Sequence, residues 1–200
     1  MQLIAGTDST WSLRVWMCLQ LVNVKAPEHI IDLSSEDYKS KILAYSPTGL
    51  VPALIDGTVI MHDSFAITEY LNEQYRGGLY PDSVKQRALA RSLCAEMHSG
   101  FMLLREHCPF TLETAEQVTL TEELKAEVSR IQSIFESAEM PYMFEFPGAV
   151  DAFYAILAFR LESYGIKLIG KAGMYQQHLL KWSLLEQAIA QAKHWEKVAV

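Results

Sequence analysis

The chain has 200 residues, of which half are apolar and a fifth are charged, and its formal net charge is −7 at pH 7. This composition is typical of a globular protein with one large or two small domains and a sizeable core. The acidic balance argues against nucleic acid as a partner, because phosphate binding requires a basic surface. No apolar run approaches the roughly 18 residues of a membrane span and no signal peptide is recognisable, so we expect no membrane partner.

The cysteines are few and widely spaced, at positions Cys18, Cys94 and Cys108. An odd and sparse set suits a reducing cytoplasm better than a disulfide scaffold. No C-x-x-C pair or Cys/His cluster indicates a metal site, and we expect no metal. Cys18 lies in the apolar helical run Val15–Leu21, which predicts a buried structural thiol.

Strand and helix signals alternate in the first 76 residues, in the order expected for an α/β layer with a mixed sheet. The predicted elements before the hairpin described next are a strand at Leu3–Ala5, a helix at Trp11–Val22, a strand at His29–Asp32 and a helix at Glu36–Tyr45. A further helix is expected from Ser64 to about Tyr75.

A hairpin and a helix start follow each other closely in the middle of this half. Val51-Pro52 opens the apolar run Ala53–Ile55, Asp56-Gly57 supplies a two-residue turn, and Thr58–Met61 returns as a second strand. Asp63-Ser64 then precedes an apolar helical pattern. The sequence therefore places bare backbone N–H groups and a hydroxyl at a helix N-terminus, where a small carboxylate can be held.

The second half of the chain reads as helical after a linker of turn residues at positions 77–84. We predict an all-helical domain over residues 85–200, with an amphipathic face of Leu89, Leu93, Met97, Phe101 and Leu104 on its first helix. The predicted helices are Lys85–Glu106, Thr121–Glu136, Gly148–Tyr164 and Tyr175–Lys197.

Hydroxyl side chains occupy the segment Thr7–Arg14 between the first strand and the first helix. A dithiol redox enzyme would carry a reactive cysteine here, so the hydroxyls exclude dithiol chemistry at this position. A hydroxyl at a helix N-terminus can donate a hydrogen bond to a sulfur anion, which the helix dipole also stabilises. The alternative is that Ser9 or Thr10 only caps the helix.

The order and spacing of Val51-Pro52 and Asp63-Ser64 resemble the glutathione transferase family, whose first domain has a thioredoxin-like fold. The resemblance implies an α/β plus all-α protein, with a thioredoxin-like domain over residues 1–76 followed by a helical bundle. It implies glutathione as co-substrate, bound by the Val51 main chain beside a cis Pro52, with its γ-glutamyl end held by Asp63 and Ser64.

The segment Ser9–Arg14 looks like the loop of the serine-type members of this family, including the zeta and tau classes. This alignment implies that Ser9 is the catalytic serine and Thr10 the second candidate. Trp11 would line the sulfur pocket, unless it serves packing alone.

The segment Ala95–Phe101 resembles the fourth-helix segment of bacterial members, in which a histidine of the beta class lies near the glutathione sulfur. Helical spacing places His98, Met102 and Arg105 on one stripe, which we expect to bind the electrophile between the domains. For His98 the alternative is an ordinary polar surface residue.

Two departures from the family pattern stand out. Leu50 replaces the Lys or Gln that helps many relatives to hold the glycyl carboxylate of glutathione, so we expect weak glutathione affinity. Lys39 or Lys41 could substitute for it, or both could be solvated surface charges. Gly148 replaces the hydroxyl residue of the family's capping box, so Asp151 is expected to satisfy backbone donors and to serve folding.

The leading hypothesis is a cytoplasmic, homodimeric enzyme that binds glutathione, stabilises its thiolate with Ser9 and adds it to a small apolar electrophile. A first alternative is a glutathione-dependent cis–trans isomerase of the maleylacetoacetate isomerase type, in which Arg14 and Arg105 would meet a dicarboxylate. A second alternative is a non-catalytic module of the same fold that binds a protein partner.

Overall fold

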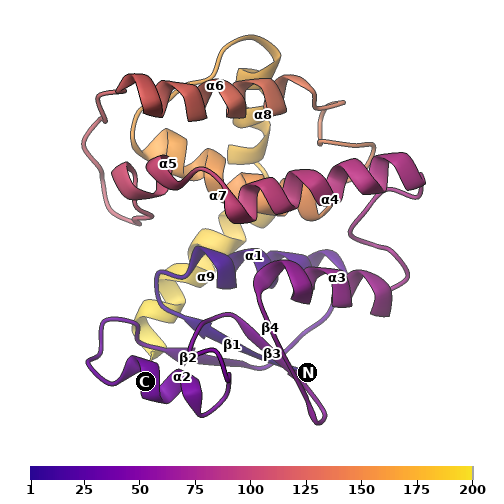
Figure 1. Ribbon diagram of the computed structural model, residues 1–200, viewed down its shortest axis with the longest axis vertical. Coiled ribbons are helices and arrows are strands. Elements are labelled where there is room, and N and C mark those ends of the chain that lie inside the picture. Colours follow the sequence, from indigo (N-terminus) through magenta and orange to yellow (C-terminus); the bar gives the residue numbers. More distant parts are fainter. Residues whose placement is uncertain (200) are drawn as a thin grey trace. The chain divides into compact units, whose positions relative to one another are not determined.

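The computed structural model describes residues 1–199, which form two compact units (Figure 1). The first unit consists of Met1–Leu79 together with the residues from Gln187 on, and the second unit is Tyr80–Glu186. The last part of the chain thus belongs to the first unit, a return that the sequence pattern does not reveal. The domain boundaries given above stay a prediction.

The first unit contains a four-stranded mixed sheet with the strand order β2-β1-β3-β4. β1 is parallel to β2 and antiparallel to β3, and β3 is antiparallel to β4. The α/β fold expected for this half is therefore confirmed. Its elements are β1 (Gln2–Gly6), α1 (Thr10–Leu21), β2 (Glu28–Ile31), α2 (Tyr38–Leu43), β3 (Ala53–Asp56), β4 (Val59–His62) and α3 (Ser64–Gln74).

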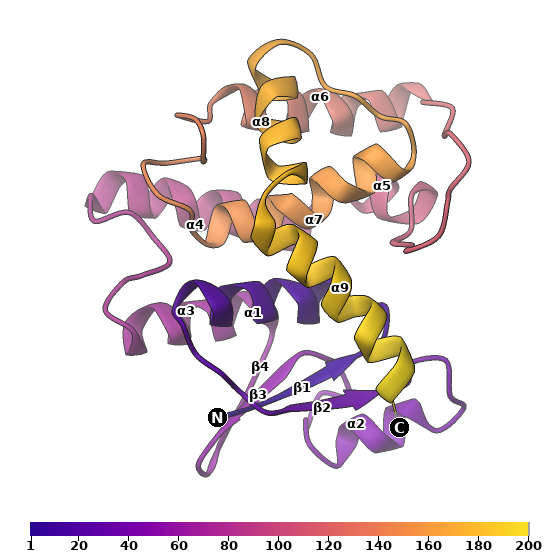
Figure 2. The ribbon, with the colours of Figure 1, turned by 180° about the vertical axis from the view of Figure 1, so that it is seen from behind.

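The helices of this unit cover both faces of the sheet, so that the inner strand β1 is buried on both sides. α1 and α3 lie side by side on one face, and α2 lies by β2 on the other (Figures 1 and 2). Ile4 of β1 packs with Ile31 and Ile42 in a cluster on the α2 side. Leu3 and Ala5 are equally buried and alternate with Ile4 along the strand.

The predicted hairpin is present, with its turn one residue later than the sequence indicates. Asp56 and Val59 are the last cross-strand pair, so the two turn residues are Gly57 and Thr58. Gly57 has a φ of 58°, a left-handed conformation that glycine adopts without steric cost.

Three side chains that donate hydrogen bonds converge on one carboxylate in the first unit. Glu28 of β2 accepts from the indole Nε1 of Trp16 at 2.9 Å, from the indole Nε1 of Trp195 at 2.6 Å and from Nε2 of Gln191 at 2.8 Å. Trp195 and Gln191 belong to α9 (Ser183–Val198), whose last turns run beside β2 (Figure 2). Glu28 therefore ties the end of the chain to the first strand pair and to α1.

The described residues of the second unit contain helices and no strand, which confirms the all-helical prediction. α7 is the central helix: it is buried on almost all sides and packs against α4 and α8. The helices are α4 (Val84–Ser99), α5 (Met102–His107), α6 (Glu122–Glu136), α7 (Ala149–Ser163), α8 (Gly170–Leu180) and the beginning of α9.

Two of the long helices predicted from the sequence are each divided in the structure. The predicted helix Lys85–Glu106 is interrupted at Gly100 and Phe101, where Gly100 is extended and Phe101 has a φ of 57°. The carboxylate of Glu127 accepts from the N–H groups of Leu103 at 3.3 Å and Leu104 at 2.8 Å, and so provides a cap for the new helix start.

The second interruption divides the predicted helix Tyr175–Lys197 at Lys181 and Trp182. Periodicity missed the two breaks because the apolar spacing of three and four residues continues through each of them.

Leu89 is expected on the buried face of the first predicted helix, but 52% of it is exposed.

Asp151 has the structural role predicted for it. Its carboxylate accepts from the main-chain N–H groups of Gly148 at 2.9 Å and Met143 at 2.8 Å, and from the Tyr175 hydroxyl at 2.6 Å. Burial raises the pKa of Asp151, while these three donors act in the opposite direction. Asp151 thus joins the start of α7, the preceding loop and α8.

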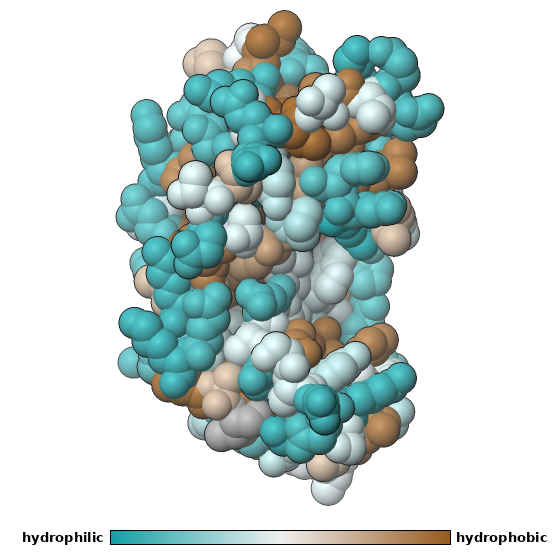
Figure 3. Space-filling model, turned by 90° about the vertical axis from the view of Figure 1, so that its left-hand side faces the viewer, coloured by the Kyte–Doolittle hydropathy of each residue, from teal (hydrophilic) through white to brown (hydrophobic). Residues whose placement is uncertain are grey.

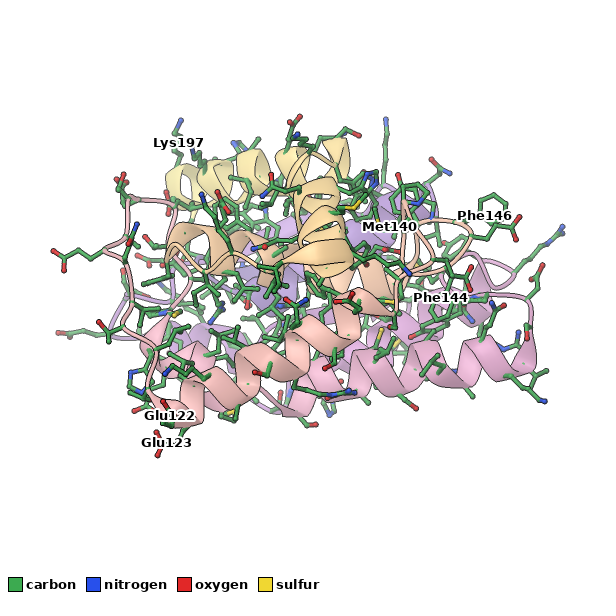
Figure 4. All side chains as sticks on the ribbon, turned by 90° about the horizontal axis from the view of Figure 1, so that it is seen from above. Glu122, Glu123, Met140, Phe144, Phe146 and Lys197 are labelled. Carbon is green, nitrogen blue, oxygen red and sulfur yellow. The ribbon has the colours of Figure 1, made fainter. Side chains whose placement is uncertain are left out.

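On the face drawn in Figure 3, polar side chains alternate with smaller apolar areas. Within residues 1–199 the most exposed aromatic residue is Phe146, on the loop between α6 and α7, whereas Phe144 on the same loop is buried. Figure 4 shows Phe146 pointing away from the helices and Glu122 and Glu123 at the start of α6. No helix among the described residues has the length and apolar character to cross a bilayer.

Replacing Glu28 by alanine is expected to destabilise the first unit. Two indole N–H groups and one amide would lose their acceptor, which costs about 2–4 kcal/mol in the free energy of unfolding. Urea denaturation followed by tryptophan fluorescence measures this loss. Glu73→Ala, an exposed change on α3, is the control and should shift stability by no more than about 0.5 kcal/mol. Equal denaturation midpoints for the two variants would contradict the role given to Glu28.

Candidate functional site

Three chain segments with polar groups meet at one end of the sheet in the first unit. β3 is antiparallel to both of its neighbours, so the end of β1, the start of β3 and the end of β4 lie at the same end of the sheet. Ser9 follows β1, Val51-Pro52 precedes β3 and Asp63-Ser64 follows β4. The fold therefore gathers the six first-unit residues predicted for glutathione binding and catalysis, since Thr10 follows Ser9 directly.

Ser9 is the N-cap of α1 and is half-buried. Its Oγ accepts hydrogen bonds from the main-chain N–H of Ser12 at 3.2 Å and from the Ser12 hydroxyl at 2.9 Å. Ser9 therefore caps α1, as the capping alternative predicts. Capping is compatible with a chemical role, because a hydroxyl that accepts two hydrogen bonds keeps its own proton for donation.

Thr10 and Trp11 follow directly as the first two helical residues. The guanidinium carbon of Arg14 lies 4.4 Å from the centre of the Trp11 ring, and Nη1 of Arg14 donates to the Thr10 carbonyl at 3.1 Å. Arg14 is only 1% exposed. Its guanidinium therefore serves the packing of the helix start, and Trp11 is held against it.

Val51 lies just outside the hydrogen-bonded ladder of the sheet. The peptide bond between Val51 and Pro52 is cis, and Pro52 is buried while Val51 is half-buried. The pairing of β3 begins at Ala53, and within residues 1–199 the main-chain N–H and C=O of Val51 have no hydrogen-bond partner. An extended peptide can bind to such a position by strand addition.

Asp63 and Ser64 form the start of α3. Asp63 has a φ of 72°, and its Oδ1 accepts from the N–H groups of Phe65 at 2.8 Å and Ala66 at 3.1 Å. For a residue other than glycine, this conformation costs about 1–3 kcal/mol, and such strain is concentrated at functional sites. Ser64 is 2% exposed. The pair offers a carboxylate beside a hydroxyl at the positive end of a helix.

The loop before Val51 carries an exposed leucine and lies against a lysine. Leu50 is 68% exposed. A Cβ atom at Gly49 would lie 3.6 Å from Cε of Lys39, so the Lys39 side chain reaches this loop. Lys41 forms an ion pair with Asp37 at 3.0 Å, and this contact lowers the pKa of Asp37. The two lysines of α2 therefore differ in their availability to a ligand.

The three residues expected to bind the electrophile belong to the second unit. The prediction of one continuous helical stripe for them is wrong, because the chain breaks at Gly100 between His98 and Met102. Arg105 nevertheless reaches both: its Nη2 donates to the carbonyls of Met97 at 2.6 Å and His98 at 2.9 Å, and its Nη1 lies 3.7 Å from Sδ of Met102. Arg105 thus caps the C-terminus of α4, and burial lowers its pKa. The binding roles of the three residues stay a prediction.

The cysteines take no part in this site. All three are free and buried. Burial raises the pKa of the Cys18 thiol to about 12, although Thr68 and Arg14 act against the shift. A thiol with this pKa is unreactive near neutral pH, which confirms the expectation of a structural residue.

The described residues also contain no group of three or more His, Cys, Asp or Glu side chains placed to hold a metal ion.

Sequence comparison supports the family resemblance in the first unit. Residues 8–74 match the family model "Glutathione S-transferase, N-terminal domain". A probable maleylacetoacetate isomerase of Caenorhabditis elegans is 39% identical over 98 residues, which are 48% of this chain and 45% of that protein. The chain thus spans less than half the length of this relative. A stringent starvation protein A homolog of Haemophilus influenzae is 27% identical over 175 residues, 85% of this chain and 79% of that protein.

Among solved structures, a glutathione transferase homolog from Burkholderia with bound glutathione is similar over 96% of this chain and 97% of its own, with a TM-score of 0.73 and 22% identity. At this identity the match shows the fold, which is that of an N-terminal thioredoxin-like domain and a helical C-terminal domain. Residues 8–74 therefore carry a glutathione S-transferase N-terminal domain.

Proposed function

We propose that this protein binds glutathione on the first unit, stabilises its thiolate with the Ser9 hydroxyl and adds it to a small electrophile. The observation that carries the proposal is the gathering of Ser9, the unpaired Val51 main chain and the Asp63-Ser64 helix start at one end of the sheet. Each feature alone is common. Together they match the thiol, the extended backbone and the charged end of one tripeptide.

The chemical task is to ionise a thiol whose ordinary pKa is about 8.5. Lowering this value by about two units requires roughly 2.7 kcal/mol of preferential stabilisation of the thiolate. A charge-assisted hydrogen bond from a hydroxyl contributes about 1.5–3 kcal/mol, and the N-terminus of α1 adds about 0.3–1 kcal/mol. Ser9 can supply the hydrogen bond because both of its observed contacts are accepted rather than donated.

The remaining groups can position the rest of the tripeptide. The free N–H and C=O of Val51 can pair with the cysteinyl main chain, as in the addition of a strand. Asp63 can accept from the α-ammonium group of the γ-glutamyl residue, and Ser64 can donate to its α-carboxylate. We further propose that the protein acts in the cytoplasm, where three free thiols are stable, and that it works as a homodimer on an apolar co-substrate.

Isomerisation through glutathione addition and elimination is the second candidate. The matched relative from Caenorhabditis elegans bears the name of a probable maleylacetoacetate isomerase, which favours it. Arg14 and Arg105 are weaker partners for a dicarboxylate than the sequence indicated. Arg14 is buried against Trp11, and Arg105 is bound to main-chain carbonyls of α4.

A non-catalytic binding module is the third candidate. The match to a stringent starvation protein A homolog, whose name states no enzymatic activity, covers more of this chain than the isomerase match does. Glutathione binding and a lowered thiol pKa separate this candidate from the two catalytic ones, because a binding module needs neither.

Replacing Ser9 by glycine should leave glutathione binding nearly intact and abolish the lowering of the thiol pKa. Glycine is a tolerated N-cap, so the cap itself loses only a few tenths of a kcal/mol. The buried Ser12 hydroxyl also loses its acceptor, which adds a stability cost of about 1–3 kcal/mol. With a shift of about two units lost, turnover near pH 6.5 should fall about 10–100-fold. The measurements are the ultraviolet absorbance of bound thiolate against pH and a conjugation assay.

Thr121→Ala is the matched control for Ser9, because Thr121 caps α6 with a hydrogen bond from the Leu124 N–H at 3.3 Å. It should cost about 1 kcal/mol of stability without changing the thiol pKa. Unchanged turnover in Ser9→Gly would contradict the role of Ser9. Absence of any glutathione binding by the unaltered protein would contradict the proposed function.

Lys39→Ala should weaken glutathione binding about 3–10-fold, because Lys39 is the α2 lysine that reaches the loop before Val51 and can attract the glycyl carboxylate. Lys41→Ala is the control, since Lys41 is paired with Asp37, and it should leave the dissociation constant within about twofold. Isothermal titration calorimetry at low ionic strength measures both. Equal dissociation constants for the two variants would show that Lys39 has no part in binding.

A further inference from the structure

We propose that Ser12 is a positioning residue, which fixes the Ser9 hydroxyl so that the proton of Ser9 is available to the sulfur. This inference rests on the proposed function and adds to it a residue with no direct contact to the ligand. Ser12 lies one helical turn after Ser9 and is completely buried.

The burial of Ser12 determines the direction of the hydrogen bond between the two hydroxyls. A buried hydroxyl proton needs an acceptor, and leaving it without one is costly. The Ser12 hydroxyl has two neighbours: the main-chain N–H of Gly6 at 3.5 Å, which is itself a donor, and Oγ of Ser9 at 2.9 Å. Among the described residues, Ser9 Oγ is therefore the acceptor for the Ser12 proton.

The same arrangement determines what Ser9 can do. A serine oxygen has two acceptor positions and one proton to donate. The Ser12 N–H at 3.2 Å and the Ser12 hydroxyl at 2.9 Å fill both acceptor positions. Ser9 is only half-buried, so its proton can turn toward a ligand without being enclosed in the core.

These contacts form a short chain of hydrogen bonds that runs from the end of β1 to the start of α1. The Gly6 N–H donates to Ser12, Ser12 donates to Ser9, and Ser9 is left to donate to the thiolate. Successive hydrogen bonds polarise one another, so the Ser12 proton makes the Ser9 proton a better donor. The chain also holds Ser9 in one rotamer, which lowers the entropy lost when the thiolate binds.

Without the Ser12 hydroxyl, one acceptor position on Ser9 becomes vacant and the Ser9 side chain can rotate. Ser12→Ala should therefore raise the pKa of the bound thiol by about half a unit to one unit, roughly a 1.5- to threefold loss of thiolate at pH 7 and a loss approaching three- to tenfold at lower pH. Alanine favours the helix more than serine does, so the variant should fold. Ser163→Ala is the control: its hydroxyl donates to the Phe159 carbonyl of its own helix in the second unit, and its loss should leave the thiol pKa unchanged.

The decisive measurement is a double-mutant cycle on the pKa of bound glutathione. If Ser12 acts through Ser9, then Ser9→Ala and the double variant Ser9→Ala/Ser12→Ala should show the same thiol pKa. Ser12→Thr, which keeps the hydroxyl, should restore most of the lowered pKa. Thermal melting of each variant identifies losses that come from stability alone.

The outcomes separate this inference from the function on which it rests. A raised thiol pKa in Ser9→Ala together with an unchanged one in Ser12→Ala overturns the role of Ser12 and leaves the proposed function standing. An equal additional loss from Ser12→Ala in both backgrounds also overturns it, because Ser12 would then act independently of Ser9. Failure of the unaltered protein to bind glutathione overturns both.

Discussion

The antiparallel pairing of β3 with both of its neighbours is the constraint on which the candidate site depends. It reverses the chain twice within one sheet, so that the end of β1, the start of β3 and the end of β4 share an edge. Three segments from distant parts of the sequence thereby present Ser9, Val51 and Ser64 together. The register also explains why the ladder stops there: beyond Ala53 the chain turns through Val51-Pro52, and the Val51 main chain is left for an added strand.

The two helix starts at this edge are electrically alike and chemically different. Before α1, the hydroxyl of Ser9 accepts two hydrogen bonds. Before α3, the carboxylate of Asp63, whose backbone is strained, accepts hydrogen bonds from two main-chain N–H groups. Both helix dipoles favour negative charge nearby. The Asp63 carboxylate already fills part of this role at α3, so an incoming ammonium group suits it. At α1 no carboxylate is present in the first turn, which leaves the favourable end of the dipole to an anionic ligand such as a thiolate.

Much of this fold could be predicted from local sequence patterns. The features that the sequence did not predict depend on contacts between residues far apart in the chain. The hairpin follows from Asp56-Gly57 and the alternating apolar runs, and the helix starts follow from Ser9 and Asp63, because each signal lies within a few residues. The break at Gly100 depends on Glu127, which caps the new helix from another element. The return of α9 to the first unit depends on Glu28, more than 160 residues away along the chain from Trp195. Ser12 could have been noticed as the hydroxyl three residues after an N-cap, but only its burial shows which way its proton points.

Capping and catalysis are not competing explanations for Ser9, because capping and the proposed catalysis use different parts of the same hydroxyl group. Capping uses the lone pairs of Ser9, which accept from the N–H and hydroxyl of Ser12. Thiolate stabilisation uses the proton, which a cap does not require. A cap that is itself hydrogen-bonded to a buried hydroxyl is held more rigidly than one exposed to water. The structural role of Ser9 therefore supports the chemical role proposed for it, since a fixed donor loses less entropy when a ligand binds.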